Sequence, residues 1–185
     1  MEISRDLPKP RYFISACLLG QKVRYDGKDC LVQALLEQLI PQQYISLCPE
    51  VAGGLNTPRP PAEIQYGSGK DVLDGKIPVV DLHGQDISTA FIQGANQALK
   101  VAQDFQATHA ILKANSPSCG SGLIYDGSFT GTIMSGDGVT AALFKRHGII
   151  VMSEKDFLLH QSNKILFECK SKTQIKSTEK FKIDM

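Results

Sequence analysis

The stretch Asn115-Ser116-Pro117-Ser118-Cys119-Gly120-Ser121-Gly122 follows a short apolar run, residues 109–113, that predicts a buried strand. Pro117 lacks a backbone donor and holds Ser116 extended, so no helix begins inside the stretch. Gly120 and Gly122 allow backbone angles that other residues avoid. The sequence therefore predicts a loop at a strand end that holds one cysteine, Cys119, among backbone amides and hydroxyl groups.

Length and composition indicate a soluble globular protein of one ordinary domain. The chain has 185 residues, of which 42% are apolar and 21% are charged. Its net charge of +1 points to neither a nucleic acid nor an anionic membrane as partner. No apolar run approaches the roughly 20 residues of a membrane helix, and the polar start is unlike a secretory signal. We expect a lead-in over residues 1–11, a single α/β domain over 12–167, and a Lys-rich tail over 168–185.

Five cysteines are present: Cys17, Cys30, Cys48, Cys119 and Cys169. An odd number without an export signal argues against a disulfide framework, so we expect a reducing, cytoplasmic location. Thiols are then available for metal binding or catalysis. Because the chain has no CxxC pair, a metal site has to gather cysteines from distant segments.

Alternating apolar patterns predict an α/β fold. Strands are expected over 12–16, 44–47, 109–113 and 149–152, and helices over 30–40 with Asp29 as cap, 88–105, 139–147 and 153–167. This order predicts a three-layer, Rossmann-like fold with a mostly parallel sheet of about four strands and helices on both faces. Residues 124–134 are expected to form a small β-hairpin excursion. A second hairpin is expected over 72–82 around Asp74-Gly75, and a long loop without elements over 51–68.

Three cysteines meet at one edge of the predicted sheet. Cys17 ends the first strand, Cys48 ends the second, and Cys119 lies in the loop after the third, where ligands bind in parallel sheets. Cys30 and Cys169 are expected away from this edge. Three thiolates leave one coordination position open, either on a zinc ion or on a four-iron four-sulfur cluster. The alternative is that they are three unrelated small buried residues.

Other polar residues are expected near these cysteines. Glu50 points the same way as Cys48 on an extended segment, where it can act as a general acid or base. Ser116 and Ser118 can reach an open metal position or cap the turn. Arg24 and Arg59 are candidates for binding a polar or anionic substrate, although each is alternatively a surface charge.

These motifs together resemble the 2-thiouracil desulfurase family over about residues 12–154. The segments that carry the resemblance are Ser15-Ala16-Cys17-Leu18-Leu19-Gly20, Val23-Arg24-Tyr25-Asp26-Gly27, Cys48-Pro49-Glu50-Val51, Gly53-Gly54-Leu55, Thr57-Pro58-Arg59-Pro60-Pro61-Ala62-Glu63, Ser116-Pro117-Ser118-Cys119-Gly120, Ile124-Tyr125-Asp126-Gly127-Ser128-Phe129-Thr130-Gly131 and Gly136-Asp137-Gly138-Val139-Thr140.

The resemblance implies an iron–sulfur enzyme. Cys17, Cys48 and Cys119 would hold an oxygen-sensitive 4Fe-4S cluster whose fourth iron stays open for the thiocarbonyl sulfur or for hydrosulfide. Glu50 and Ser116 match the positions implicated in catalysis. The implied reaction removes sulfur from a 2-thiouracil-like nucleobase or similar thioamide, giving the oxo compound and hydrosulfide without net redox change.

Two other functions remain open from the sequence. One is a non-catalytic iron–sulfur or sulfide-binding protein, such as a sensor or sulfur carrier. The other is a hydrolase with Cys119 as nucleophile, although no histidine is positioned by sequence as its base. The expected partner is a small thiolated molecule, with no nucleic acid and no membrane, and the oligomeric state is left open.

Overall fold

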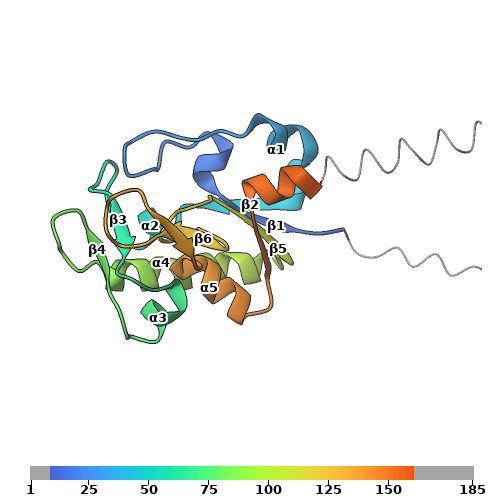
Figure 1. Ribbon diagram of the computed structural model, residues 1–185. Coiled ribbons are helices and arrows are strands. Elements are labelled where there is room, and N and C mark those ends of the chain that lie inside the picture. The colour runs from blue at the N-terminus through green and yellow to red at the C-terminus, as the bar shows by residue number, and fades with distance from the viewer. Residues whose placement is uncertain (1–8, 161–185) are drawn as a thin grey trace, which may run out of the picture. The chain divides into compact units, whose positions relative to one another are not determined.

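Four short apolar segments form a parallel sheet in the computed structural model, which describes residues 9–160. The strands are β1 (Tyr12–Ser15), β2 (Tyr44–Leu47), β5 (His109–Leu112) and β8 (Ile150–Ser153), in the order β2-β1-β5-β8 (Figure 1). All three pairings are parallel. The expected parallel α/β sheet is confirmed, and it lies in the unit that ends at Glu154.

The strand order places a topological switch at the centre of the sheet. Tyr12 of β1 pairs with Tyr44 on one side and with His109 on the other. The chain runs from β1 to one edge strand and from β5 to the opposite edge strand. Ligands in such sheets bind outside the carboxyl ends of the strands at this switch, here between β1 and β5.

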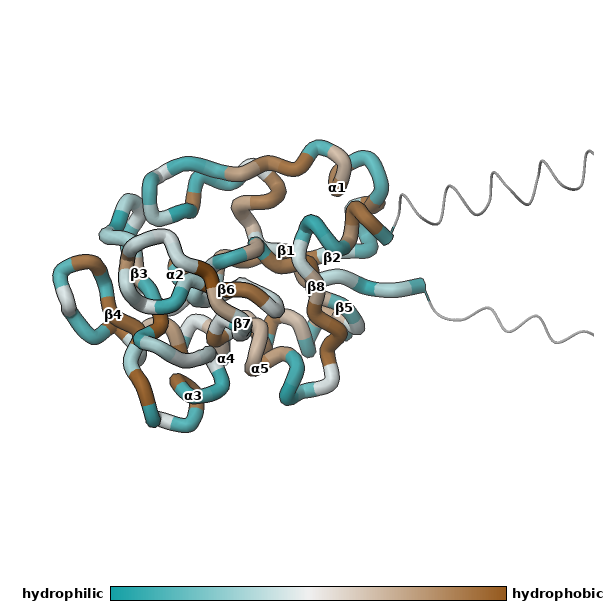
Figure 2. Tube along the Cα trace, viewed as in Figure 1, coloured by the Kyte–Doolittle hydropathy of each residue, from teal (hydrophilic) through white to brown (hydrophobic). Residues whose placement is uncertain are grey.

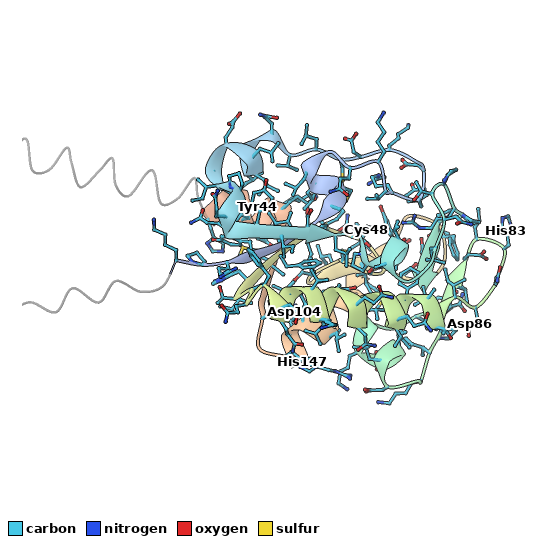
Figure 3. All side chains as sticks on the ribbon, turned by 180° about the vertical axis from the view of Figure 1, so that it is seen from behind. Tyr44, Cys48, His83, Asp86, Asp104 and His147 are labelled. Atoms are coloured by element: carbon cyan, nitrogen blue, oxygen red, sulfur yellow. The ribbon has the colours of Figure 1, made fainter. Side chains whose placement is uncertain are left out.

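Helices cover both faces of the sheet. Helices α4 (Ser88–Asp104) and α5 (Val139–Arg146) lie on one face and α1 (Gln33–Gln38) lies on the other, as the front and back views agree (Figures 1 and 3). Phe13 of β1 meets Phe144 of α5 edge to face, with ring centroids 5.0 Å apart. Figure 2 shows hydrophobic stretches in the strands between these layers, so burial of the sheet stabilises the scaffold beneath the rim.

Shorter elements connect these strands and helices. They are two 3₁₀ helices, η1 (Ala16–Leu19) and η2 (Pro41–Gln43), two helices, α2 (Pro49–Ala52) and α3 (Gly69–Leu73), and two antiparallel pairs, β3 (Ala62–Ile64) with β4 (Val79–Asp81) and β6 (Leu123–Tyr125) with β7 (Ile133–Ser135). The second pair confirms the hairpin expected over 124–134.

Two expectations for the middle of the chain are wrong. Residues 72–82 form no hairpin: the Ser68 amide and hydroxyl both donate to Asp71, starting α3, and Asp74-Gly75 ends that helix. The segment 51–68 is not a loop without elements, because it contains the end of α2 and strand β3. Antiparallel pairing of β3 with β4 reaches across α3, which local turn signals do not reveal.

Helix boundaries also differ from expectation. The helix predicted from Cys30 begins at Gln33, because Asp29 accepts a hydrogen bond from the Leu31 amide (3.1 Å) in a turn that precedes it. Residues 154–160 are helical. The remainder of the helix expected to residue 167, the start of the lead-in and the Lys-rich tail lie outside the described residues. Within residues 9–160, no helix has the length and apolar character needed to cross a membrane.

Candidate functional site

A cavity of about 520 Å³ opens at the carboxyl ends of the strands. The predicted site residues that line it are Cys17, Arg24, Cys48, Glu50, Arg59, Ser116 and Cys119. The three cysteines among them follow three separate strands, and Figure 3 shows Cys48 directly after β2. The structure therefore brings together seven of the eight residues that the sequence singled out.

Each cysteine in the cavity is fixed by the local backbone. Cys17 lies in η1, which ends at Gly20 with a φ of 87°. Cys48 is the N-cap residue of α2, with Pro49 in the first turn, and its thiol lies 3.8 Å from the Val23 carbonyl oxygen. These positions follow from the turns that end each strand.

Cys119 is held by a hydroxyl from the neighbouring strand. The Ser15 hydroxyl donates to its sulfur at 3.3 Å and accepts a hydrogen bond from the Lys113 amide at 3.1 Å. Ser15 is the last residue of β1 and is itself buried. This contact links the β1 and β5 ends at the switch point.

Ser116 both shapes the loop and faces the cavity. Its hydroxyl oxygen accepts hydrogen bonds from the amides of Ser118 and Cys119, each at 3.1 Å, and its carbonyl accepts from the Gly120 amide at 2.8 Å. The capping role that the sequence allowed is therefore present. Because both backbone contacts use the oxygen as acceptor, the hydroxyl proton is available for donation into the cavity.

Ser118 is the one predicted residue that the cavity does not include. Its side chain is fully buried, and its hydroxyl shares a 2.9 Å hydrogen bond with Thr140 of α5. Residues 117–119 form a turn and not an extended segment, so Ser116 and Ser118 do not share a face. In this structure Ser118 anchors the loop to α5.

Burial keeps the site thiols protonated in the absence of metal. It raises the pKa of Cys48, and it raises that of Cys119 to about 12. The pKa of Cys17 is also raised, first by a hydrogen bond with Cys30 and then by burial. Metal binding at these thiols therefore has to displace protons.

Cys30 lies beside Cys17, and the expectation that it sits away from this edge is wrong. The Cys30 amide donates to the Cys17 carbonyl at 3.0 Å. The hydrogen bond between the two thiols lowers the pKa of Cys30 to about 6. The segment between them folds back over the end of β1, although Cys30 is not among the described residues that line the cavity.

Sequence reasoning missed the contribution of the fourth strand. Glu154 follows β8 directly, is buried, and accepts hydrogen bonds from the Lys113 ammonium (3.0 Å) and the Ala114 amide (2.8 Å). It thereby holds the beginning of the Cys119 loop. Residues that follow a parallel strand lie at the edge where ligands bind, and this argument applied to Glu154 as well as to the cysteines. A single glutamate at that position, however, belongs to no recognisable motif.

The far wall of the cavity comes from two segments. Arg59 and Pro61 precede β3 and Ala62 and Glu63 belong to it, whereas Phe129 and Gly131 lie between β6 and β7. The Glu63 carboxylate joins them by accepting from the Gly127 and Phe129 amides at 2.9 and 3.1 Å. Residues 59–63 therefore supply part of the cavity wall.

The donors in this cavity fit an iron–sulfur cluster. Cys17, Cys48 and Cys119 all line it, and cysteine thiolates are the usual ligands of such clusters. Soft sulfur donors also select for iron–sulfur clusters over hard cations.

Fold and site together define an α/β protein with a cysteine-lined cavity at the switch point of its sheet. The family model for 2-thiouracil desulfurase matches residues 13–156. The chain belongs to this family, and the resemblance noted in its motifs is confirmed.

Two relatives support this assignment. The chain is 43% identical over 143 residues to the uncharacterized protein YbbK of Bacillus subtilis (strain 168), covering 77% of this chain and 95% of YbbK. A solved structure of the [4Fe-4S]-dependent thiouracil desulfidase TudS matches with a TM-score of 0.72 and 45% identity. That match covers 83% of this chain and 99% of TudS.

Proposed function

We propose that this protein is an iron–sulfur-dependent desulfidase that removes sulfur from 2-thiouracil or a similar thiolated nucleobase. The observation that carries the proposal is the convergence of Cys17, Cys48 and Cys119 on one cavity that also holds Glu50 and Ser116. The dependence of TudS on a 4Fe-4S cluster, at 45% identity, supports the same cofactor here.

The three thiols would hold the cluster, each as a thiolate. When bound, a cluster with three cysteine ligands supplies an iron with an open position, a soft Lewis acid toward a thiocarbonyl sulfur. Burial of Cys119 and the walls around the cavity limit water around the reacting carbon. The volume of about 520 Å³ lies within the range of small-molecule sites.

Glu50 and Ser116 would manage the protons of the hydrolysis. The Oε1 atom of Glu50 has no hydrogen-bond partner within residues 9–160, so it can take a proton from the attacking water. The Ser116 hydroxyl can donate toward a ring nitrogen or oxygen of the base. In the overall balance C=S and water give C=O and hydrogen sulfide, which is released as hydrosulfide and a proton. No electron is gained or lost.

Anaerobic reconstitution with iron and sulfide tests this proposal. We expect about four irons and four sulfides per chain, visible charge-transfer absorbance, and turnover of at least one member of a panel of thiouracils and thiocytosines. A cluster without turnover of any thiolated base would instead favour a sensor or sulfur carrier. Full activity in metal-free protein would leave only a cysteine-nucleophile hydrolase.

A further inference from the structure

We propose that Arg59 is a positioning residue for Glu50 and contacts no substrate, although it lines the cavity. This inference deepens the proposed function and rests on it. The sequence suggested Arg59 as a substrate ligand, because a cationic side chain near a cavity commonly binds polar groups. The hydrogen bonds of its guanidinium group point to a different role.

Every nitrogen of the Arg59 guanidinium group already has a protein oxygen as partner. Nε donates to Oε2 of Glu50 at 2.9 Å, and Nη2 lies 2.7 Å from the same oxygen. Nη1 donates to the Val23 carbonyl (3.2 Å), the Asn56 carbonyl (3.0 Å) and the Thr57 hydroxyl (3.3 Å), and Nη2 also donates to Val23 at 3.2 Å. Because each guanidinium nitrogen is already paired with protein oxygens, Arg59 is a poor candidate for binding a substrate.

The pair is shielded from solvent, which makes its geometry persistent. The side chain of Arg59 is 8% exposed and that of Glu50 is 16% exposed. Charge-assisted bonds of this kind are shorter and stronger than neutral ones. An exposed pair such as Lys100 with Asp104 gives no comparable constraint.

Both contacts fall on one oxygen of Glu50, and this selects the reacting atom. With Oε2 held by Arg59, Oε1 is directed by default to the remaining space around the carboxyl group. Removing Arg59 frees rotation of the carboxyl group about its last bond. Misplacement of a catalytic group by about 1 Å costs up to about 10²-fold in rate.

Arg59 also joins the segments that surround Glu50. Its amide donates to the Tyr25 carbonyl at 2.9 Å. The Val23 carbonyl that accepts from its guanidinium lies next to the Cys48 thiol as well. Arg59 therefore ties the segment after β1 to the start of α2, where the proposed base is attached.

The test is a kinetic comparison of variants in the iron-loaded enzyme. We expect Arg59→Gln to lower kcat by about 10- to 100-fold and to leave KM within about twofold. Arg59→Lys keeps the charge but not the two-contact geometry, so its kcat should lie between those of the Gln variant and the wild type. The Lys variant also serves as the measurement if the Gln variant does not fold.

Arg24→Gln is the matched control. Arg24 lines the same cavity but forms its ion pair with Asp26 at 3.2 Å and has no contact with Glu50. If Arg24 is the substrate ligand, its replacement raises KM. A double-mutant cycle combines Arg59→Gln with Glu50→Gln. If Arg59 acts through Glu50, the kcat of the double variant equals that of Glu50→Gln alone within about twofold.

Hydrosulfide binding supplies a readout that needs no turnover. Changes in visible absorbance on adding sodium hydrosulfide should give the same Kd for wild type and Arg59→Gln. A KM raised tenfold with kcat unchanged, a weaker Kd, or losses that multiply in the double variant would overturn the positioning role and leave the desulfidase intact. Wild-type protein that binds a cluster but turns over no thiolated base would overturn the proposed function itself.

Discussion

Cys17, Cys48 and Cys119 each reach the cavity from a different part of the sheet, so none can stand in for another. Replacing any one with serine leaves a harder, less acidic donor, and we expect loss of at least most of the bound iron after anaerobic reconstitution. Iron and sulfide analysis per chain, with the visible spectrum, measures this.

The matched control for that series is Cys30→Ser. Cys30 touches Cys17 but does not belong to the described lining of the cavity, so its replacement should leave the iron content near that of the wild type. Loss of the cluster in Cys30→Ser as severe as in Cys17→Ser would mean that the ligand set has been misassigned.

A substitution at Glu50 can separate the effect on catalysis from the effect on cofactor binding. It lies two residues after Cys48, yet its carboxylate is held by Arg59 and not by a thiol. Glu50→Ala should therefore keep the cluster spectrum and lose turnover by about 10²-fold or more, the usual worth of a general base. Undiminished turnover in a fully loaded variant would remove Glu50 from the mechanism.

At the scale of elements, the position of Glu50 depends on a close contact between α2 and α4. A Cβ on Gly94 would overlap the Pro49 carbonyl oxygen, and one on Gly53 would overlap that of Ala90. Only glycine at both positions lets the two backbones approach so closely. Helix α4 thus sets the height of α2 above the sheet.

Gly94→Ala is expected to destabilise the fold despite the higher helix propensity of alanine. Overpacking of this kind costs about 1–3 kcal/mol, and relief by outward movement of α2 would also lower turnover. Gln97→Ala, on the exposed side of α4, should stay within about 0.5 kcal/mol of wild type. Thermal unfolding measures both, and equal midpoints would show that α2 yields without strain.

The sheet and its cysteines were predictable because each depends on local patterns. Apolar runs ended by Pro or Gly located the four strands, and the parallel topology then brought Cys17, Cys48 and Cys119 to one edge. The pairing of β3 with β4 was not predictable in this way. The Asp74-Gly75 signal is shared by hairpins and helix ends, and only the Ser68–Asp71 cap distinguishes them here.

Side-chain partners were harder to predict than positions. Both hydroxyls beside Pro117 were candidates for the cavity, but only Ser116 faces it, since Thr140 of a distant helix binds Ser118. Cys30 lies beside Cys17 because an irregular segment folds back, and such segments carry no periodicity. The Arg59–Glu50 pair likewise joins two turns whose relative placement depends on tertiary packing.

For the whole molecule, a cluster bound at three strand ends would crosslink segments from residue 17 to residue 119. Ligands that bind only the folded state raise its stability, so removing iron with an anaerobic chelator should lower the melting temperature. The size of this decrease depends on pH, because the same thiols can bind protons in the metal-free protein but are bound to iron in the loaded protein.

The direction of that dependence follows from the raised thiol pKa values of the metal-free protein. In the unfolded chain Cys119 ionises near its usual value of 9.0, whereas in the fold its pKa is about 12. Between these two pH values the folded state therefore binds more protons than the unfolded chain. The contribution of this thiol to the free energy of unfolding is full below pH 9 and decreases by about 1.4 kcal/mol per pH unit as the pH rises. The cluster-loaded form, with its thiolates on iron, lacks this loss.

We therefore expect the difference in melting temperature between loaded and metal-free protein to widen from pH 8 to pH 10. Metal-free Cys119→Ser is the control, since its stability should vary less with pH over this interval than that of the metal-free wild type. If melting temperature depends on pH in the same way for loaded and metal-free wild type, the buried thiols are not the groups that iron binding deprotonates. The cluster would then not bind at this cavity.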